Sequence, residues 1–600
     1  MGCDMKFAAD FETTTEETDC RVWAWGVCEI GNPTYFAHGN NIDTFMHFME
    51  KSSNASFYFH NLKFDGEFII CWLFENGFKH IKDRSQADSK TFTTLISDKG
   101  QFYSIRIYFD KKGRKVNAVN LYDSLKILPF SVSDVAKAFA LPLSKLEIDY
   151  TEKREVGHAL TEEEIAYLRN DVEIMARALD VIFSQGLTKM TQAGNAMHDY
   201  KNTVGAKSFS RWFPPPDYDA DVRQSYKGGF TYLNPDYKNL EIGAGLVLDV
   251  NSLYPWVMHD CPLPYGDGIY FEGQYKHHNM YPLYVQMLTC IFELKPNKIP
   301  TIQLKGNLSF VPTEYLTSSN GEEVTMCLTS VDLELFFDHY DVYALEYHSG
   351  WMFKSTIGLF TEYIDKWTEV KIDAGRTGNK PMRVLAKLML NALYGRFALN
   401  PNVCSKIPYY DGGTVKYTNG DKETREPIYI PVGTFITAWA RHKTITSAQR
   451  LYKYFIYADT DSLHLNIPLP PELLEKSDKE LEELTTLELI RAGVDIPEDF
   501  NIDPYALGAW KVEECFKRAR YIRQKSYIHD HNPPEAWEDA EKYDKSLLKI
   551  TCAGMPASCY QFVTWDNFRE SQRFPGKLQP KHVPGGIILK EIDFTIKRGS

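Results

Sequence analysis

Tyr457-Ala458-Asp459-Thr460-Asp461-Ser462 places two carboxylates two residues apart, between the apolar runs 453–456 and 463–467. The pattern predicts a strand, a tight turn and a second strand, with both acids at the tip of the hairpin. One explanation is an ordinary turn, because Asp is common in turns. The other is a cation site, because buried unpaired acids are costly and Mg²⁺ prefers carboxylate oxygens. Matching residues elsewhere in the chain would favour the cation site.

The composition predicts a folded protein of several domains. The chain has 600 residues, of which 44% are hydrophobic and 14% aromatic. No run of about 18 apolar residues appears, and the first residues lack the regions of a signal peptide, so we expect neither a membrane span nor secretion. The eleven cysteines form no C-x-x-C pair. We therefore expect free thiols in a reducing compartment and no zinc site.

The charge is unevenly distributed. The formal net charge of −13 argues against a nucleic-acid partner. However, residues 366–396 and 542–600 each carry a net charge of +5, and residues 516–528 contain five bases and no acid, whereas residues 472–503 carry −8. A solvated helix face explains any single run. Three basic runs in one half of the chain favour a polyanionic partner.

Acidic residues recur near the N-terminus. Asp10 and Glu12 lie in an apolar run that predicts a strand, where both point to the same face. Asp65 follows an aromatic strand and precedes an apolar helix, so it is either an N-cap or a further metal carboxylate. Thr161 and Glu164 form a capping box before another helix.

That later helix carries a phenol beside a carboxylate. Tyr167 and Asp171 are four residues apart and share a helix face, which is compatible with core packing or with an active site that orients water. Lys145 lies upstream in a polar connection. Together Asp10, Glu12, Asp65 and Asp171 have the residue types and settings needed for two-metal phosphodiester hydrolysis.

A second pair of features matches the central hairpin. Residues 245–250 predict a buried strand that ends near Asp249, which could join Asp459 and Asp461. Residues 382–398 predict a strong helix on which Lys387, Asn391 and Tyr394 share one face. These side chains suit a triphosphate, a sugar or base, and a stacking surface. A snorkelling lysine on an amphipathic helix is the alternative.

The remaining segments provide connections and surfaces. A proline-rich joint at 214–216 follows a domain boundary that we place near 190, and Gly228-Gly229 allows close backbone approach or a simple turn. Residues 262–360 predict a strand-rich inserted module, and 409–417 a hairpin. A helix is predicted from 434, with Arg441 in its first turns. Lys525 and Tyr527 are predicted to share a strand face.

In chain order, the segments D-F-E, N-x-x-x-D and Y-x-x-x-D resemble the 3′→5′ proofreading exonuclease of family B DNA polymerases. The segments D-x-x-S-L-Y-P, K-x-x-x-N-x-x-Y-G, Y-x-D-T-D-S and K-x-Y resemble the polymerase motifs of that family. The chain is most similar to the protein-primed members of small Bacillus podophages, the phi twenty-nine type. The resemblance covers nearly the whole chain. It implies an α/β and α+β multidomain fold, with an RNase H-like exonuclease domain and a right-hand polymerase carrying two family-specific insertions.

The resemblance implies seven segments. They are the exonuclease domain (1–190), the first part of the palm (191–261), a first insertion that binds terminal protein and DNA (262–360), the fingers (361–398), a second, β-hairpin insertion for strand displacement and processivity (399–427), the second part of the palm (428–533) and the thumb with a C-terminal tail (534–600).

Roles for individual residues follow from the same resemblance. In the polymerase site, Asp249, Asp461 and the Val250 carbonyl would hold two Mg²⁺ ions, with Asp459 close by and Mn²⁺ able to substitute. Tyr254, Lys371, Arg383, Lys387, Asn391 and Tyr394 would bind the incoming nucleotide. Tyr226, Gly228, Gly229, Ser252, Thr437, Arg441, Lys525 and Tyr527 would bind template and primer. In the exonuclease, Asp10, Glu12, Asp65 and Asp171 would bind two metal ions, Tyr167 and Lys145 would orient water and phosphate, and Thr15, Asn61 and Phe64 would touch the single-stranded end.

The implied function is processive, strand-displacing DNA synthesis, primed by a terminal protein and proofread by the exonuclease. The implied partners are DNA, dNTPs and terminal protein, with a monomeric enzyme in the cytoplasm of a bacterial host and no membrane contact. Two alternatives stay open: a family B polymerase that uses nucleic-acid primers, and a non-catalytic single-strand DNA-binding factor. The finger segment 373–381 is longer than the family leads us to expect, which weakens the assignment of Lys371 and Arg383, and the acidic segment 472–503 has no assigned role.

Overall fold

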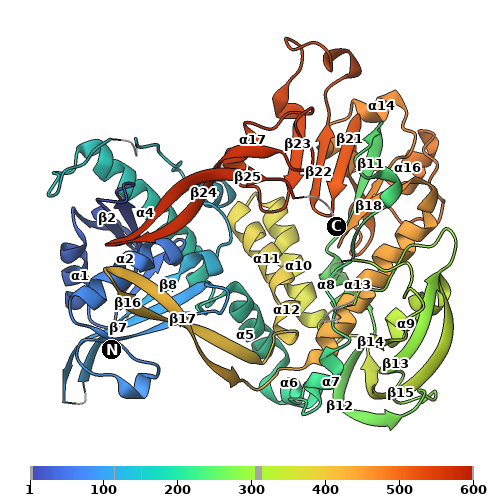
Figure 1. Cartoon of the computed structure of the whole chain (residues 1–600), viewed down its shortest axis with the longest axis horizontal. Coiled ribbons are helices and arrows are strands. Elements are labelled where there is room, and N and C mark those ends of the chain that lie inside the picture. The colour runs from blue at the N-terminus through green and yellow to red at the C-terminus, as the bar shows by residue number, and fades with distance from the viewer. Residues whose placement is uncertain (1–4, 114, 150–151, 305–313, 598–600) are drawn as a thin grey trace.

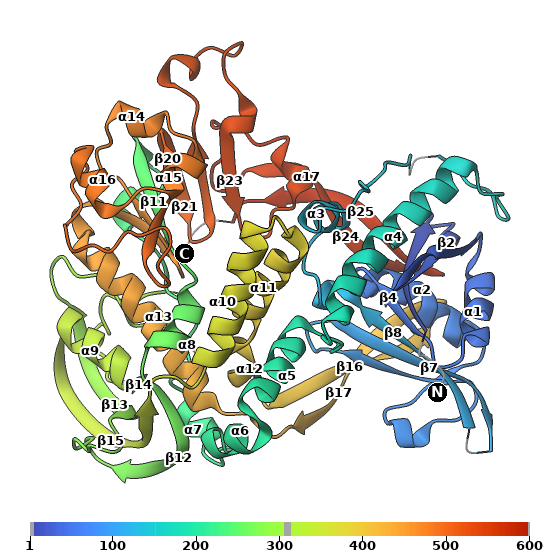
Figure 2. The same cartoon turned by 180° about the vertical axis from the view of Figure 1, so that it is seen from behind.

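The computed structural model describes residues 5–113, 115–149, 152–304 and 314–597. Small parts of the predicted segments 1–190, 262–360 and 534–600 therefore lie outside the described residues. Over the described ranges the chain forms six sheets with helices packed around them (Figures 1 and 2). The expected mixture of α/β and α+β architecture is confirmed. No helix in these ranges is both long and apolar enough to cross a membrane.

The N-terminal part is built on a sheet of eight strands in the order β3-β2-β1-β4-β8-β7-β6-β5. Its strands are β1 (Lys6–Thr13), β2 (Val22–Glu29), β3 (Asn32–Gly39), β4 (Ser56–Phe59), β5 (Lys79–His80), β6 (Thr91–Ile96), β7 (Phe102–Lys112) and β8 (Lys115–Asp123). Helices α1 (Ile42–Lys51), α2 (Leu62–Glu75), α3 (Val132–Ala138) and α4 (Glu162–Ser184) accompany this sheet. The predicted capping box of Thr161 and Glu164 begins α4, and Arg154 donates to the buried Glu164 at 2.7 Å.

The central part contains a five-stranded antiparallel sheet in the order β20-β11-β19-β18-β9. Its strands are β9 (Thr231–Leu233), β11 (Gly245–Val250), β18 (Phe455–Asp459), β19 (Ser462–Leu465) and β20 (Trp510–Phe516). A neighbouring sheet consists of β10 (Glu241–Ile242), β21 (Arg518–Arg523), β22 (Ser526–Asp530) and β23 (Leu548–Cys552). The hairpin predicted around Asp459 and Asp461 is therefore confirmed as β18 and β19. Its turn contains Thr460 in the left-handed region at φ 58°.

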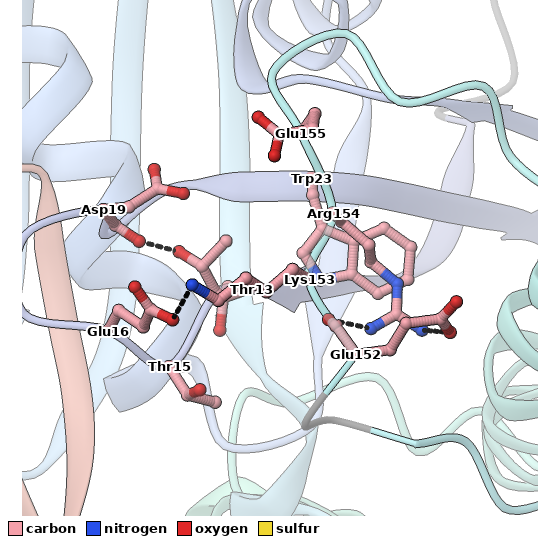
Figure 3. A pocket seen from close by; sticks show the side chains of 10 residues that line it. Thr13, Thr15, Glu16, Asp19, Trp23, Glu152, Lys153, Arg154 and Glu155 are labelled. Carbon is pink, nitrogen blue, oxygen red and sulfur yellow. Dashed lines mark hydrogen bonds and ion pairs between the residues drawn. The ribbon is translucent and has the colours of Figure 1, made fainter.

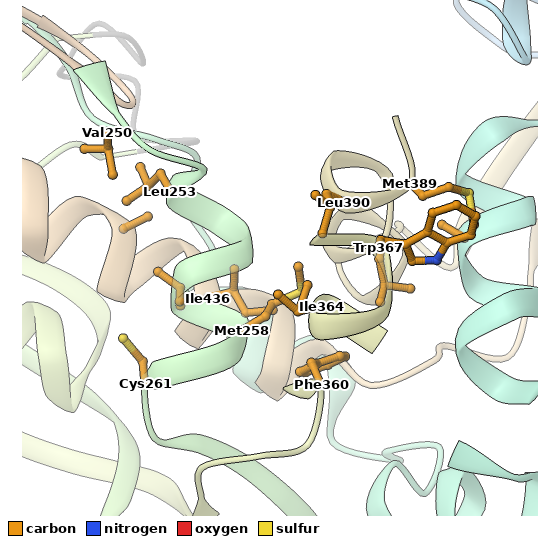
Figure 4. Packing of buried hydrophobic residues seen from close by; sticks show 14 of the residues in the cluster. Val250, Leu253, Met258, Cys261, Phe360, Ile364, Trp367, Met389, Leu390 and Ile436 are labelled. Atoms are coloured by element: carbon orange, nitrogen blue, oxygen red, sulfur yellow. The ribbon is translucent and has the colours of Figure 1, made fainter. Parts of the chain in front are cut away.

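Helices join this sheet to the N-terminal part. They are α5 (Gln192–Val204), α6 (Ala206–Trp212), α7 (Asp219–Arg223), α8 (Leu253–Asp260), α10 (Thr361–Arg376), α11 (Lys380–Ala392), α12 (Tyr394–Phe397) and α13 (Ile430–Arg450). Buried side chains of α8, α10, α11 and α13 belong to one continuous apolar core, which includes Leu253, Met258, Ile364, Leu390 and Ile436 (Figure 4). Each Å² of apolar surface buried in this core contributes about 25 cal/mol to stability, so the core holds these helices firmly together.

The described residues within 262–360 form a strand-rich module, as the sequence predicts. Its sheet runs β12-β15-β13-β14, with β12 (Leu263–Glu272), β13 (Leu283–Leu294), β14 (Val324–Thr329) and β15 (Tyr340–Thr356), and it carries α9 (Ser330–His339). The acidic segment forms three short helices, α14 (Pro471–Leu474), α15 (Asp478–Glu482) and α16 (Thr486–Arg491). The other short elements are α17 (Ala557–Tyr560), η1 (Arg84–Gln86), η2 (Ser124–Lys126), η3 (Pro235–Tyr237), η4 (Tyr452–Tyr454), η5 (Pro534–Ala536) and η6 (Lys545–Leu547).

Two long hairpins extend from the rest of the chain to the N-terminal sheet (Figure 1). They are β16 (Asn402–Asp411) with β17 (Thr414–Thr424), and β24 (Arg573–Val583) with β25 (Gly586–Thr595). Both contact α2, and β17 contacts β24. Tyr417 of the first hairpin donates to the buried Glu67 of α2 at 2.8 Å, and His582 of the second lies 3.6 Å from the same carboxylate.

The structure corrects four local predictions. Asp65 is not the N-cap of α2, because Asn61 occupies that position. The predicted helix 382–398 begins at Lys380 and is broken at Leu393. Helix α13 begins four residues before the predicted start, so Arg441 lies in its middle. Lys525 lies in a left-handed turn at φ 56° rather than in a strand, so it cannot share a strand face with Tyr527.

Candidate active sites

The first site combines strand β1 with helices α2 and α4. Asp10 and Glu12 lie two residues apart on β1, and Asp65 lies in the first turn of α2. Asp171 lies on α4, which packs against β1. Lys145 places its Nζ 3.3 Å from Asp171 Oδ2. The four acids therefore gather at one place on the N-terminal sheet.

Burial makes the charged forms of these acids unfavourable. Part of the surface of Asp10 is accessible, yet burial among protein atoms and the nearby Asp171 raise its pKa to about 7. Burial and neighbouring carboxylates also raise the pKa of Glu12 and of Asp65 well above their usual values. Burial raises the pKa of Asp171, although Lys145 partly opposes this shift. The site thus has a surplus of negative charge whenever its acids are ionised.

These residues fit divalent cations. One oxygen of Asp65 and one of Asp171 are buried without a hydrogen-bond partner. Buried carboxylate oxygens are normally paired, so such atoms are consistent with ligands for a hard cation. In the described part of the chain, no three His, Cys, Asp or Glu side chains already converge into a metal cage. Mg²⁺ does not require one, because it often uses one or two carboxylates together with substrate phosphates.

The other residues that the resemblance implies for this site differ in their exposure. Tyr167 is buried beside Asp171 and favours its ionised form. Asn61 is exposed in a left-handed conformation, and its backbone N–H donates to Asp123 Oδ1 at 3.0 Å. Phe64 is half-buried. Thr15 is exposed and lines a polar pocket with Thr13 and Glu16 (Figure 3).

The sequence interpretation missed Asp123, which the end of an alternating strand followed by a turn could have indicated. It is 2% exposed and accepts a hydrogen bond from the backbone of Asn61. Its role is to fix the loop that carries Asn61.

The second site lies where β11 meets the β18–β19 hairpin. Asp249 is paired in register with Ser462, and the Val250 N–H donates to the Asp461 carbonyl oxygen at 2.7 Å. The structure therefore brings Asp249 and Asp461 together, as the two strand ends predict. Burial and Asp461 raise the pKa of Asp249 to about 8, and burial likewise raises the pKa of Asp461.

Asp459 has a different environment from Asp461. Its carboxylate accepts hydrogen bonds from Thr231 Oγ1 at 3.0 Å and from the Tyr457 hydroxyl at 3.2 Å, and Lys525 Nζ lies 3.2 Å away. These partners already engage its oxygens. This geometry supports the expectation that Asp459 has a supporting function.

The helices opposite the acids carry basic and aromatic side chains. Lys371 lies on α10, and Arg383, Lys387 and Asn391 lie on α11. Burial and mutual repulsion lower the pKa of Lys371 and of Lys387. Such a concentration of cations is costly without an anion, and a triphosphate would relieve it.

Two tyrosines stack on each other between α8 and α12. Tyr254, in α8 just after the left-handed Ser252, stacks on Tyr394 with ring centroids 4.0 Å apart. Because Tyr394 begins α12, it stands beyond the helix break and not on the continuous α11 face that the sequence predicts.

One glycine of the pair 228–229 supports the turn between β18 and β19. A Cβ on Gly229 would come within 2.6 Å of Thr460 Oγ1, and Thr460 N–H donates to the Phe230 carbonyl oxygen at 2.6 Å. Gly229 is therefore needed for close approach, whereas a Cβ on Gly228 would meet nothing within 4 Å. Tyr226 is half-buried beside this segment.

Two residues predicted to contact DNA are buried. Arg441 is 3% exposed and donates to both oxygens of Asp332 and to the Lys227 and Gly228 carbonyl oxygens. Thr437 is 1% exposed and donates to the Thr434 carbonyl oxygen at 3.1 Å. Arg441 thus supports the segment 226–229, and contact of either side chain with DNA stays a prediction. Lys525 and Tyr527 remain at least partly accessible.

The sequence interpretation also missed Lys511 and Glu482, which lie near Asp249. Lys511 is paired in register with Asp249 across β20 and β11. The apolar alternation of 510–516 could have predicted a strand, but not its neighbour.

Comparison with known proteins agrees with this arrangement. The fold is that of a multidomain α/β DNA polymerase with exonuclease and polymerase domains. The family model described as DNA polymerase type B, organellar and viral, matches residues 46–480, and the chain belongs to this family. It is 45% identical to the DNA polymerase of Bacillus phage M2 over 98% of this chain and 99% of that one. It is also similar to the structure of Phi29 DNA polymerase complexed with primer-template DNA, with a TM-score of 0.87, 42% identity and coverage of 99% and 100% of the two chains. A structure of that polymerase with primer-template DNA and incoming nucleotide substrates matches equally well, with a TM-score of 0.87 and 43% identity over the same shares of the two chains.

Proposed function

We propose that the chain is a protein-primed, processive and strand-displacing DNA polymerase, with 3′→5′ exonuclease activity at a separate site. The observation that carries the proposal is the meeting of Asp249 and Asp461 opposite the cations Lys371 and Lys387. Relatives of this chain are described in complexes with primer-template DNA, incoming nucleotides and single-stranded DNA. We infer the same partners here, together with a terminal protein, for a monomeric enzyme in the host cytoplasm.

At the polymerase site, the residues bind and orient the nucleotide. Lys371, Arg383 and Lys387 hold the triphosphate, while the Tyr254–Tyr394 stack supports its sugar and base. Asp249 and Asp461, with the Val250 carbonyl, would hold two Mg²⁺ ions. When bound, these ions would neutralise charge as a 3′-hydroxyl, or a protein hydroxyl at initiation, attacks the α-phosphate and pyrophosphate leaves.

At the exonuclease site, Asp10, Glu12, Asp65 and Asp171 would hold the cations, and the orphaned oxygens of Asp65 and Asp171 are suited to this role. Lys145 and Tyr167 orient the phosphate and the attacking water. Thr15, Asn61 and Phe64 hold the frayed 3′ end. Competition between extension and transfer of this end would determine fidelity.

We also propose functional assignments for the seven segments. The eight-stranded sheet corresponds to the exonuclease (1–190), and the five-stranded sheet to the palm (191–261 and 428–533). The module 262–360 would receive terminal protein and DNA. Helices α10 and α11 are the fingers, the hairpin β16–β17 separates strands, and residues 534–600 form the thumb.

The test separates the two sites. Asp249→Ala or Asp461→Ala should reduce primer extension by at least about 10³-fold and leave exonuclease activity largely intact, because only one carboxylate cluster loses a ligand. The paired change Asp10→Ala with Glu12→Ala should do the reverse. Primer extension and degradation of a labelled single strand measure both activities. Loss of both activities in either variant would contradict the two-site assignment.

Two further measurements address the alternatives. Templated transfer of a nucleotide onto a purified terminal protein separates protein priming from nucleic-acid priming. Extension of a primed circle without accessory proteins tests processivity and strand displacement together. The quantity measured is the length of the products. A non-catalytic single-strand-binding factor would give no Mg²⁺-dependent incorporation in either assay.

A further inference from the structure

Lys511 occupies an unusual position in the polymerase site. It pairs in register with Asp249 across neighbouring strands, so both side chains lie on the same face of the sheet. Its Nζ is 3.9 Å from Asp249 Oδ2, and its side chain is 25% exposed. Lys511 was not assigned any role by the sequence motifs. A lysine so close to a catalytic carboxylate needs a functional explanation.

A second acid approaches Lys511 from the acidic segment. Glu482 Oε1 lies 3.8 Å from Lys511 Nζ. Helix α15, which ends at Glu482, packs against β20 (Figure 2). Its start is fixed by a capping box between Ser477 and Glu480, and Leu481 is 1% exposed. The acidic segment therefore holds a carboxylate at the edge of the nucleotide site.

Neither acid captures the ammonium group. Both distances exceed the 2.7–3.2 Å range of a normal N–H···O hydrogen bond. Lys511 therefore lies between two attractions, and its flexible four-carbon stem allows the charge to move toward a third anion. A tight Lys511–Asp249 pair would instead compete with any cation at Asp249.

The positive charge of Lys511 repels the cations Lys371 and Lys387 on the finger helices α10 and α11. Burial is the largest cause of the lowered pKa of Lys371, followed by Lys387, Arg383 and then Lys511. The pKa of Lys387 is also lowered, by burial first, then by Arg383 and Lys511. Palm and finger cations thus surround one volume, into which the proposed triphosphate would fit.

We propose that Lys511 is a fourth cation of the nucleotide site, which moves from between Asp249 and Glu482 to contact the phosphates of the incoming dNTP. This inference rests on the proposed polymerase function and extends it. Glu482 restrains the ammonium from full pairing with Asp249, so Asp249 stays available for a cation. The acidic segment thereby gains a function in nucleotide binding.

The test measures nucleotide affinity apart from chemistry. Wild type and Lys511→Gln are compared in steady-state extension and in equilibrium binding of the correct dNTP to a complex with a dideoxy-terminated primer. Lys511→Gln should raise both KM and the dissociation constant about tenfold while kcat changes less than about twofold, because a charged phosphate contact is lost. Lys511→Arg should retain most of the affinity.

A matched control removes a different lysine that also pairs with the acidic segment. The side chain of Lys453 is 77% exposed, and its Nζ lies 3.6 Å from Asp495 Oδ2. Lys453 precedes the start of β18, whereas Asp459 and Asp461 lie at the other end of that strand. Lys453→Gln changes the net charge equally and should leave KM unaltered. An equal rise of KM in this variant would overturn the proposal, because charge alone would then explain the effect.

The double variant Lys511→Gln with Glu482→Gln restores the wild-type net charge. Its KM should stay as high as that of Lys511→Gln if Lys511 touches the phosphates. Recovery of KM would overturn the direct contact, as would a loss of kcat with unchanged KM. Exonuclease rates of all variants report on folding. If wild type incorporates no nucleotide, the proposed function itself fails, whereas an active wild type with unchanged KM in Lys511→Gln defeats this inference alone.

Discussion

The two carboxylate clusters differ in how their negative charge is balanced. In the N-terminal cluster, Asp10, Glu12, Asp65 and Asp171 share a buried position with Lys145 as the cation in ion-pair contact. In the central cluster, Lys511 and Lys525 lie beside the acids, and the finger cations face them. The first arrangement therefore depends strongly on added cations for ionisation. The second provides positive charge for a large anionic substrate as well.

Among the tests of this difference in charge balance, removing one lysine at each cluster should have the largest effect. Lys145→Gln should lower the single-turnover exonuclease rate about 100-fold, since Lys145 is the cation that opposes the raised pKa of Asp10, Glu12 and Asp171 and can stabilise developing charge there. Lys525→Gln should lower extension by about tenfold or less, because other cations share its task. Rapid-quench measurements on bound DNA provide both rates.

Lys126 offers a matched control for the first change. It lies 3.9 Å from Asp123, an acid outside the four of the N-terminal cluster. Lys126→Gln should leave the exonuclease rate within about threefold of wild type. Equal losses in Lys145→Gln and Lys525→Gln would show that the two clusters do not differ in charge balance.

A smaller effect concerns stability and pH without divalent ions. A carboxyl group with a raised pKa keeps its proton in the folded protein at a pH where the unfolded chain has lost it. The unfolded state then binds fewer protons, so stability falls as pH rises, up to about 7 for Asp10 and about 8 for Asp249. Thermal unfolding in EDTA should show a decreasing Tm between pH 5 and 8. Mg²⁺ should raise Tm more at pH 8 than at pH 5.5.

The variant Asp10→Asn with Glu12→Gln identifies the source of this slope. Its Tm in EDTA should depend less on pH than that of wild type, because two of the buried acids no longer titrate. A slope identical to that of wild type would mean that the N-terminal cluster does not carry the excess charge.

The smallest expected effect, a shift in Tm, separates the cost of burying a single carboxylate from the cost of clustering several. Glu67 is buried apart from both clusters, and burial raises its pKa to about 8. Glu67→Gln should raise Tm by about 2 °C at pH 9 and by progressively less as the pH falls toward 4.5, because above its usual pKa the wild-type carboxyl must take up a proton on folding. Neither activity should change. A Mg²⁺-dependent difference in Tm would instead connect Glu67 with the N-terminal cluster.

The parts of the sites that the sequence predicts best are those determined by local chain geometry. Alternation placed Asp10 and Glu12 on one strand face, and the turn pattern placed Asp459 and Asp461 at a hairpin tip. The capping box fixed the start of the helix that carries Asp171. Order along the chain and residue type were sufficient here.

What the sequence could not show depends on long-range pairing. Arg441 was predicted in the first turns of its helix, yet it lies in the middle of α13, and its charge is matched by Asp332, more than a hundred residues earlier in the chain. Lys511 became visible only when β20 was placed beside β11. The break after Ala392 also escaped, because tertiary packing overrode an otherwise continuous helical pattern.

The contact of both long hairpins with Glu67 of α2 has a consequence for synthesis of the chain on the ribosome. Tyr417, which donates to Glu67, lies 350 residues later in the sequence, and His582 follows later still. At a translation rate of about 5–20 residues per second, roughly 20–70 s pass between the synthesis of Glu67 and that of Tyr417. The nascent N-terminal sheet must therefore tolerate an uncovered face on α2 for most of translation. Protection of this helix from proteolysis would accordingly mark the completion of the whole chain.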